Sequence, residues 1–266
     1  MTRFREYGSG PYDVAVLHGG PGAAGEMAPV ARALSRSRGV LEALQTASTV
    51  EGQLEELAST LRENASLPVS LIGHSWGAML GLLFTAGNPD LVKKLILVNS
   101  GVLENRYAAD IMKTRLGRMT EEDRAAVLSL TDVTTGEKPG NKNEAFSLLG
   151  AYISKADSFD PLPGEDEIIE CRFDIYESVW GEAQELRSSG GFTDAAGRVR
   201  CPVVAIHGDY DPHPPEGIRE PLAAVISEFN FILLENCGHR PWTERQAQAR
   251  FYEILRDETA FTSPGR

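Results

Sequence analysis

The sequence predicts an α/β fold in which a mostly parallel sheet, flanked by helices, is interrupted by a helical insertion. Short apolar runs alternate with amphipathic segments before residue 103 and again after residue 199, which is typical of parallel sheets covered by helices. Between these two parts the strand patterns disappear and apolar residues recur at helical spacing. We therefore expect a core of residues 1–103 and 199–266 and a helical cap of residues 104–198.

In the first part, each expected strand is a short apolar run that leads into a helical segment. The expected strands are residues 13–17 (DVAVL), 40–44, 69–72 (VSLI) and 94–98 (KLILV). The helices expected between them are residues 26–38, 49–62 and 76–86. Few residues precede the first strand, so the leading hairpin is expected to be short or absent, in a sheet of about six to eight strands.

The middle of the chain contains three expected helical regions. Thr120 followed by Asp123 resembles a capping box that opens a helix. A second apolar face includes Phe146 and Tyr152, and residues 168–186 form a third, long one. The α/β pattern then resumes with strands at residues 202–206 (PVVAI) and 229–234 (FNFILL) and helices at residues 216–226 and 243–256.

Composition and charge narrow the class of protein. The formal net charge of −12 opposes binding to nucleic acid or to an anionic membrane, so neither is expected as a partner, and a small-molecule substrate is expected from the motifs described below. Three widely spaced cysteines form neither a disulfide framework nor a metal motif, as expected in a reducing compartment. With no signal-peptide pattern and no membrane-length apolar run, we expect a cytoplasmic protein. The sequence leaves the oligomeric state open.

Gly73-His74-Ser75-Trp76-Gly77 is the strongest chemical signal. This G-x-S-x-G pattern lies between the strand VSLI and the helical run WGAMLGLLF, which is the context a nucleophilic serine requires. The turn is sharp and strained, and the flanking glycines provide room for it. The start of the helix also places backbone N–H groups where an oxyanion develops.

His18-Gly19-Gly20-Pro21-Gly22 follows the first expected strand. Glycines allow the backbone to approach a ligand closely, so this loop is expected to complete an oxyanion hole. We expect its two donors to be the backbone N–H groups of Gly20 and Trp76.

Two carboxylates after the strand PVVAI are candidates for the acid that orients a catalytic base. Asp209 directly follows Gly208 and is expected to shape the turn through bonds to the backbone. Asp211 lies farther out on the loop, where a base can reach it, and is preferred.

His239 follows the last expected strand and is the expected base. Ligand-binding groups gather at the carboxyl ends of strands in α/β sheets. The order Ser75, Asp211, His239 is also a known chain order for a catalytic triad. His213 is the reserve candidate, but it is close to Asp211 in sequence. No two histidines stand at metal-ligand spacing with a carboxylate on one face, so no metal is expected.

Together, HGGPG and GHSWG resemble the proline iminopeptidase-like branch of the α/β-hydrolase superfamily, and the resemblance covers nearly the whole core. It implies an α/β-hydrolase fold with a helical cap, a covalent acyl-enzyme intermediate and no cofactor. It also assigns the site roles to Ser75, Asp211, His239, Gly20 and Trp76. The chain departs from the pattern in lacking the D-x-x-G-x-G-x-S stretch between the first helix and the serine motif.

The expected function is hydrolysis of an ester or amide bond in a small substrate, by a carboxylesterase or an aminopeptidase. A hydrolase of carbon–carbon bonds or thioesters would use the same triad, and a non-catalytic ligand receptor is a further alternative. Tyr152, Trp180 and Trp242 are candidate pocket residues, although core packing is the more common role of such aromatic side chains and is preferred for each of them.

Overall fold

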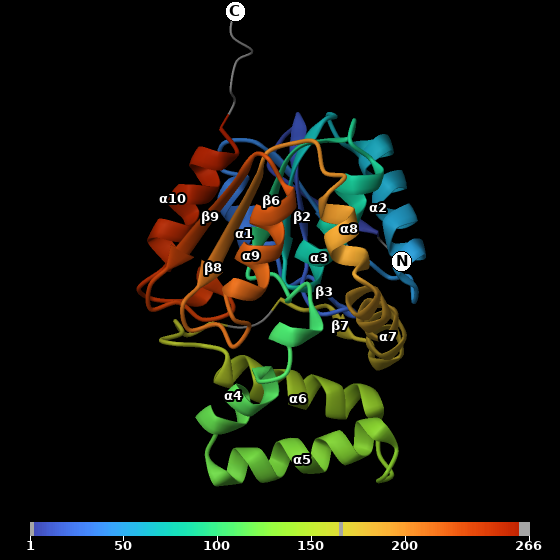
Figure 1. The fold of residues 1–266 in the computed structure, drawn as a ribbon, viewed down its shortest axis with the longest axis vertical. Coiled ribbons are helices and arrows are strands. Elements are labelled where there is room, and N and C mark those ends of the chain that lie inside the picture. Colours follow the sequence, from blue (N-terminus) through green and yellow to red (C-terminus); the bar gives the residue numbers. More distant parts are fainter. Residues whose placement is uncertain (1–2, 165–166, 261–266) are drawn as a thin grey trace, which may run out of the picture.

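A seven-stranded, mostly parallel sheet forms the centre of the molecule (Figure 1). The computed structural model describes residues 3–164 and 167–260, and within them the sheet order is β1-β4-β2-β5-β6-β8-β9. β1 pairs antiparallel with β4, and the other neighbouring strands are parallel. The strands are β1 (Phe4–Tyr7), β2 (Tyr12–Leu17), β4 (Gly39–Ala43), β5 (Val69–His74), β6 (Val92–Val98), β8 (Val203–Gly208) and β9 (Phe229–Leu234). The predicted fold class is confirmed.

Helices cover both faces of the sheet. Because successive strand side chains point to opposite faces, Leu71 and Ile72 of β5 enter two different cores. The core that contains Ile72 also includes side chains of α1 (Ala28–Leu34) and α10 (Gln248–Glu258). The core that contains Leu71 includes side chains of five other helices: α2 (Val50–Asn64), α3 (Trp76–Gly87), α7 (Phe173–Ser189), α8 (Gly191–Ala196) and α9 (Glu216–Val225).

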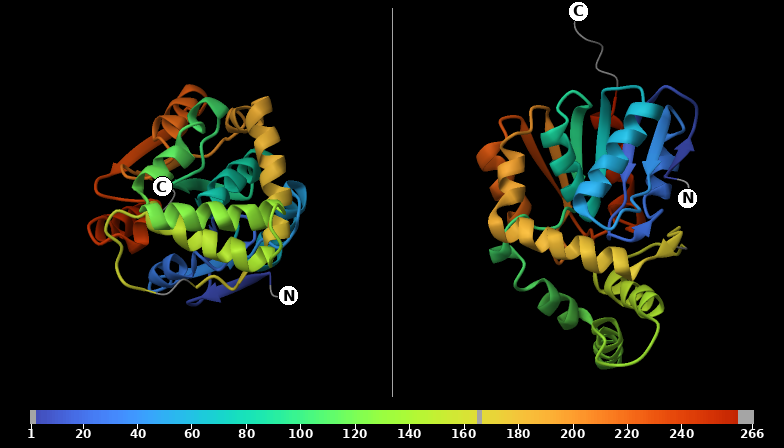
Figure 2. Two further views of the ribbon diagram at one scale, coloured as in Figure 1. Left: turned by 90° about the horizontal axis from the view of Figure 1, so that it is seen from below. Right: turned by 90° about the vertical axis from the view of Figure 1, so that its right-hand side faces the viewer.

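A group of helices lies beyond the carboxyl ends of the parallel strands (Figures 1 and 2). It consists of η1 (Asn105–Tyr107), α4 (Ile111–Arg118), α5 (Glu121–Thr135), α6 (Lys142–Ala156) and α7 (Phe173–Ser189). Thr120 caps α5 by accepting a hydrogen bond from the backbone N–H of Asp123 at 3.1 Å. Two short strands, β3 (Ala23–Ala24) and β7 (Glu170–Cys171), pair antiparallel and join the loop after β2 to this helical group.

Several element boundaries differ from the sequence prediction. The helix expected from residue 168 begins at Phe173, because Glu170 and Cys171 are engaged in β7. The helix expected from residue 243 begins at Gln248, after the 3₁₀ turn η2 (Pro241–Thr243). Strand β1 was not among the expected strands, and it supplies the antiparallel edge without a full leading hairpin. Among the described residues, no helix is both long and apolar enough to cross a membrane.

The strand order places two of the motif loops side by side. From β2 the chain first adds β4 on one side and then returns to add β5 on the other. Loops that follow strands on either side of such a reversal flank a crevice, which is the usual ligand site of an open α/β sheet. Here these are the loop that begins at His18, after β2, and the turn at Ser75, after β5.

Candidate active site

Ser75 lies in a strained turn between β5 and α3. Its φ of 51° and ψ of −113° fall outside the regions that a residue with a side chain ordinarily adopts. A Cβ atom at Gly73 would lie 2.2 Å from the carbonyl oxygen of Gly77, and one at Gly77 would lie 2.4 Å from that of His18. Both flanking positions therefore require glycine, which explains the G-x-S-x-G spacing in physical terms.

The loop after β2 lies directly against this turn. A Cβ atom at Gly19 would be 3.1 Å from the Cβ of Ser75. The N–H of Gly19 donates to Glu26 Oε2 at 3.0 Å, so it is directed away from a substrate. Gly20 adopts a positive φ of 31°, and its carbonyl oxygen accepts from the N–H of Ala23 in a tight turn. The N–H of Gly20 is thus the better candidate for an oxyanion donor in this loop.

The second expected donor is the backbone N–H of Trp76. As the first residue of α3, Trp76 has no carbonyl one turn earlier in the helix to accept this N–H. Its indole is buried, with Nε1–H donating to Gln53 Oε1 at 2.9 Å. This bond between α3 and α2 fixes the start of the helix that carries the donor.

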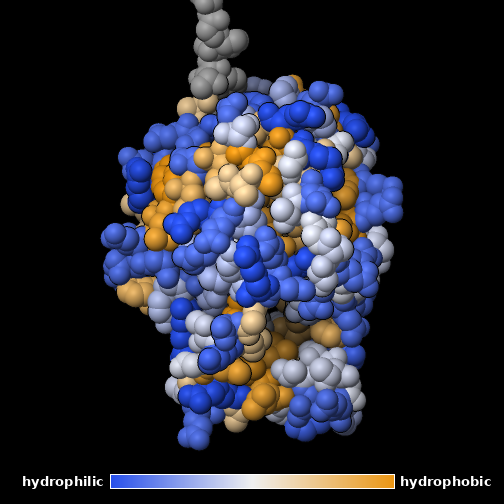
Figure 3. Space-filling model, in the orientation of Figure 1, coloured by the Kyte–Doolittle hydropathy of each residue, from blue (hydrophilic) through white to orange (hydrophobic). Residues whose placement is uncertain are grey.

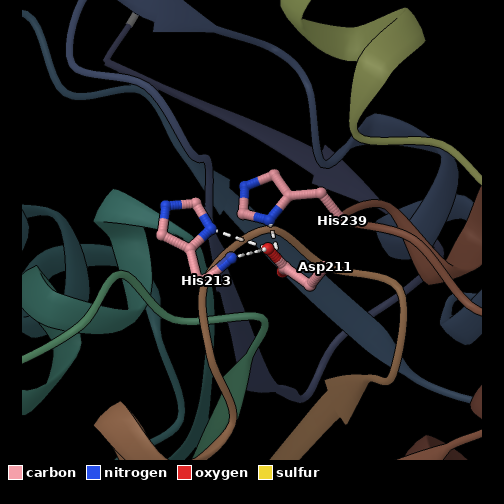
Figure 4. A group of neighbouring side chains, drawn as sticks. All are labelled: Asp211, His213 and His239. Atoms are coloured by element: carbon pink, nitrogen blue, oxygen red, sulfur yellow. Dashed lines mark hydrogen bonds and ion pairs between the residues drawn. The ribbon is translucent and has the colours of Figure 1, made fainter. Parts of the chain in front are cut away.

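Asp211 and His239 form a short hydrogen bond (Figure 4). His239 Nδ1 lies 2.6 Å from Asp211 Oδ2, and because the carboxylate can only accept, the hydrogen is on Nδ1. The other ring nitrogen, Nε2, is left as the basic atom. Burial lowers the pKa of His239, but the negative charge and hydrogen bond of Asp211 outweigh it and raise the pKa overall.

A second imidazole binds the other oxygen of the same carboxylate. His213 Nδ1 lies 2.7 Å from Asp211 Oδ1, which also accepts from the backbone N–H of His213 at 2.9 Å. The two rings lie side by side, with centroids 4.9 Å apart, and turn their second nitrogens to the same side, away from Asp211 (Figure 4).

The two imidazoles differ in charge. Burial lowers the pKa of His213 to about 4, so its ring is neutral at physiological pH. Burial also tends to raise the pKa of Asp211, but the two histidines hold it well below its usual value, so the carboxylate is ionised. These three groups lie close enough to hold a metal ion, but their hydrogen-bonding atoms face one another. The arrangement suits a carboxylate that orients a base.

The loops that carry Asp211 and His239 are held together by two side chains at other strand ends. Asn99, directly after β6, accepts from the N–H of Gly208 and donates to the carbonyl of Gly238. Asp209, the alternative acid, accepts from the N–H of Cys237 at 3.1 Å and so ties the same loops together.

The base loop is also bound to the helical group. The backbone N–H of His239 donates to the carbonyl of Asp157 at the end of α6, at 2.8 Å. The carboxylate of Asp157 is in turn paired with Arg115 of α4, with Nη2 and Oδ2 2.7 Å apart. The position of the base is therefore coupled to the packing of α4 and α6.

The three aromatic residues expected in the pocket lie in different surroundings. Trp242 is buried and packs edge-on against His74, with centroids 4.7 Å apart, and against Phe251, which places it in the core. Trp180 is half-buried and stacks on Tyr176, at the edge of the core. Tyr152 packs on a small apolar cluster of α4, α5 and α6. Core packing therefore explains the position of Trp242.

A cavity of about 440 Å³ opens near the carboxyl ends of β2 and β4. Its apolar lining comes from Leu44, Ile169 and Ile175, and its charged lining from Arg5, Arg172 and Glu170. The N–H of Gln45, another lining residue, contacts His18 Nε2 at 3.2 Å, which joins the cavity wall to the glycine loop. The volume is within the range of small-molecule sites.

Comparison with known proteins agrees with this geometry. The model of the family described as "Alpha/beta hydrolase family" matches residues 11–253. The chain belongs to the α/β-hydrolase family. This hydrolase is similar to the proline iminopeptidase of Lactobacillus acidophilus, with 27% identity over 74% of the chain and 68% of the relative. It is 25% identical to the proline iminopeptidase of Heyndrickxia coagulans, over 92% of the chain and 89% of the relative. The resemblance inferred from the motifs is confirmed.

Solved structures show the same fold at lower identity. The crystal structure of VinJ aligns with a TM-score of 0.65 and 19% identity, covering 96% of this hydrolase and 93% of VinJ. The monoacylglycerol lipase of Paleococcus ferrophilus aligns with a TM-score of 0.61 and 15% identity, covering 96% of both chains. These similarities establish the fold and leave the substrate to be argued from the site.

Some residues of the site carry no motif of their own. Glu26 lies just before α1 and reaches His74 and Gly19, yet its sequence context is an ordinary loop. The second hydrogen bond to Asp211 comes from His213, which the sequence suggests as a reserve base and not as a partner of the acid. A histidine two residues after an acidic candidate is the signal that indicates such a pairing.

Proposed function

We propose that this α/β-hydrolase is a serine hydrolase in which Ser75 is the nucleophile, His239 the base and Asp211 the orienting acid. The observation that carries the proposal is the 2.6 Å contact between His239 Nδ1 and Asp211 Oδ2, which leaves Nε2 as the proton acceptor. The strained turn at Ser75 and the adjacent glycine loop support it.

In this mechanism Ser75 Oγ attacks the carbonyl carbon of the substrate while His239 Nε2 takes its proton. The N–H groups of Gly20 and Trp76 stabilise the negative charge that develops on the carbonyl oxygen. His239 then gives the proton to the leaving group, which departs and leaves an acyl group on Ser75. Water, activated by the same histidine, releases the acid and restores the serine.

We propose a small ester as the preferred substrate. The 440 Å³ cavity near the glycine loop is lined by apolar groups and by more positive than negative side chains, which suits a neutral or anionic acyl group. An aminopeptidase would need acidic groups free to bind an ammonium. Glu26 is already bonded to His74, and Asp174 is paired with Arg172 at 2.7 Å.

Aminopeptidase activity is the second candidate, because the curated relatives that match most of the chain are proline iminopeptidases. Glu170 lines the cavity and is the acidic side chain there that could bind a substrate amine. Its neighbours Arg5 and Arg172 oppose that role.

The test is hydrolysis of a short-chain acyl nitrophenyl ester and a prolyl nitroanilide by the wild type and by Ser75→Ala. Loss of the nucleophile should lower kcat by roughly 10⁴-fold or more. Ser70→Ala is the matched control, because Ser70 is a buried serine of β5, the strand that leads into Ser75. We expect the ester to be the faster substrate and the control to retain wild-type turnover.

If Ser75→Ala retains the wild-type rate on both substrates, the assignment of the nucleophile is wrong. If activity depends on Ser75 but the prolyl nitroanilide is the faster substrate, the chain is an aminopeptidase and the argument from the cavity charges fails.

A further inference from the structure

Three loops of the site meet at one buried imidazole, that of His74. Its Nδ1 lies 3.1 Å from Glu26 Oε2, and its Nε2 lies 2.9 Å from the carbonyl oxygen of His239. The same Glu26 oxygen accepts from the N–H of Gly19 at 3.0 Å. The glycine loop, the serine turn and the base loop are thus joined by one hydrogen-bonded chain.

The hydrogen bonds of His74 and Glu26 show which atoms donate. The carbonyl of His239 can only accept, so Nε2 of His74 carries a hydrogen and donates to it. Burial tends to raise the pKa of Glu26, but the interaction with His74 outweighs it and lowers the pKa to about 2, so the carboxylate is ionised and accepts from Gly19.

The surroundings allow this pair little freedom. The side chain of His74 is 1% exposed and that of Glu26 is 14% exposed. A Cβ atom at Gly19 would lie 2.6 Å from Glu26 Oε2 and 2.7 Å from His74 Nδ1, so a glycine is required for the loop to approach. The edge-on ring of Trp242 contacts His74 from another side. A buried polar pair with satisfied hydrogen bonds favours one geometry over its alternatives.

We propose that Glu26 and His74 are positioning residues that set the oxyanion loop and the base loop relative to Ser75. The inference rests on the proposed serine mechanism. Glu26 holds Gly19, and with it the neighbouring N–H of Gly20, while His74 holds the backbone of His239. A displacement of either loop weakens the interactions with the transition state more than those with the bound substrate. Loss of Glu26 or His74 is therefore expected to lower kcat.

The test compares Glu26→Gln, His74→Asn and the double variant in hydrolysis of the preferred nitrophenyl ester. Each single variant should lower kcat by about 10- to 100-fold and leave KM within about twofold. The double variant should be no slower than the slower single variant, because either change breaks the same chain of bonds. Glu42→Gln is the matched control, since Glu42 is a fully buried glutamate of β4 that bonds Tyr7 instead.

A second measurement needs no variant. Nitrogen-15 spectra of histidine-labelled wild type should show a hydrogen on Nε2 of His74, which bonds the carbonyl of His239. Glu26→Gln should shift the Nδ1 resonance of His74, because it removes the carboxylate 3.1 Å away, while the thermal unfolding transition remains cooperative.

The inference is overturned if Glu26→Gln keeps kcat within twofold of the wild type, if it loses no more activity than Glu42→Gln, or if the losses of the two single variants multiply. A His74 Nδ1 resonance that Glu26→Gln leaves unchanged would also contradict it. Turnover that survives Ser75→Ala is a separate result, because it refutes the serine mechanism whatever the behaviour of Glu26.

Discussion

At the scale of single residues, the site depends on how each histidine is bonded. His239 and His213 share one carboxylate but have opposite pKa shifts. Burial tends to lower the pKa of both rings and Asp211 tends to raise it, but the charge of Asp157 adds to the rise at His239, whereas the charge of His239 adds to the fall at His213. His74 has a separate acidic partner, Glu26. His239 and His213 are thereby expected to serve as the base and as the neutral partner of the acid, and His74 holds the loop of the base through its backbone.

The raised pKa of His239 predicts the pH dependence of activity. The base must be unprotonated to take the proton of Ser75, so kcat/KM should rise with pH through an apparent pKa above 6.5. His213, with a pKa of about 4, titrates well below the pH range in which kcat/KM is expected to rise. Asp211→Asn should move the midpoint to lower pH, because it removes the charge that favours the imidazolium, and should lower kcat by about 10³- to 10⁴-fold.

The measurement is a pH profile of kcat/KM for the wild type and Asp211→Asn with the same ester. A wild-type limb below pH 6.5, or a midpoint that Asp211→Asn leaves in place, would contradict this electrostatic account of the base.

At the scale of elements, the carboxyl ends of the parallel strands hold the site together. Asn99, at the end of β6, adopts a positive φ of 42° and is fully buried. Its amide bonds Gly208 at the end of β8 and Gly238 after β9, at 2.9 and 2.7 Å. The loops of the acid and the base are therefore fastened to a third strand.

Asn99→Ala should destabilise the fold and slow the reaction. Two buried backbone groups lose their partners, at a cost of about 1–3 kcal/mol each in the free energy of unfolding. Urea denaturation should show this loss, and kcat should fall with it. The loss of stability in Asn99→Ala has two possible causes, backbone strain at the positive φ and the missing hydrogen bonds. Asn99→Gly separates them, because glycine adopts a positive φ without strain but cannot make the two bonds. Asn230→Ala, at an exposed position of β9, is the control.

If Asn99→Ala is as stable and as active as Asn230→Ala, the fastening role of Asn99 is refuted. If Asn99→Gly recovers the wild-type stability, backbone strain and not the two hydrogen bonds accounts for the loss.

The elements also show what the sequence can predict. The strands β2, β5, β6 and β8 are apolar runs that are mostly buried in the sheet, and β9 is an apolar run at its edge, patterns that local composition reveals. β1 is a half-exposed edge strand, FREY, and β7 has two residues, so both depend on partners distant in sequence. The predicted start of α7 is wrong for the same reason, because the residues just before it pair with a strand distant in sequence.

At the scale of the whole molecule, the helical group covers the edge of the sheet where the candidate site lies (Figure 2). Hydrophobic side chains gather on the face of this group that Figure 3 shows. Exposed apolar residues of its helices include Met112, Leu128 and Leu148. The bonds from Asp157 to His239 and to Arg115 join the group to the base loop, so its packing and the chemistry of the site are connected.

The sequence predicts the candidate nucleophile, acid and base better than it predicts the surroundings of the site. Motifs identify Ser75, Asp211 and His239 because each follows a recognisable strand, and the structure brings Asp211 and His239 into contact. Glu26, Gln53 and Asn99 reach the site through the tertiary fold alone. The cavity likewise combines segments near residues 5, 45 and 170, whose proximity no local pattern shows.

The central claim is that Ser75 is a nucleophile activated by His239, and covalent labelling tests it most directly. A fluorophosphonate should form a bond between its phosphorus and Ser75 Oγ, with fluoride leaving and the serine proton passing to His239. Peptide mass spectrometry should place the adduct on Ser75 in the wild type, find none in Ser75→Ala, and find far slower labelling in His239→Ala. An adduct on another residue, or equal labelling of wild type and Ser75→Ala, would contradict the account.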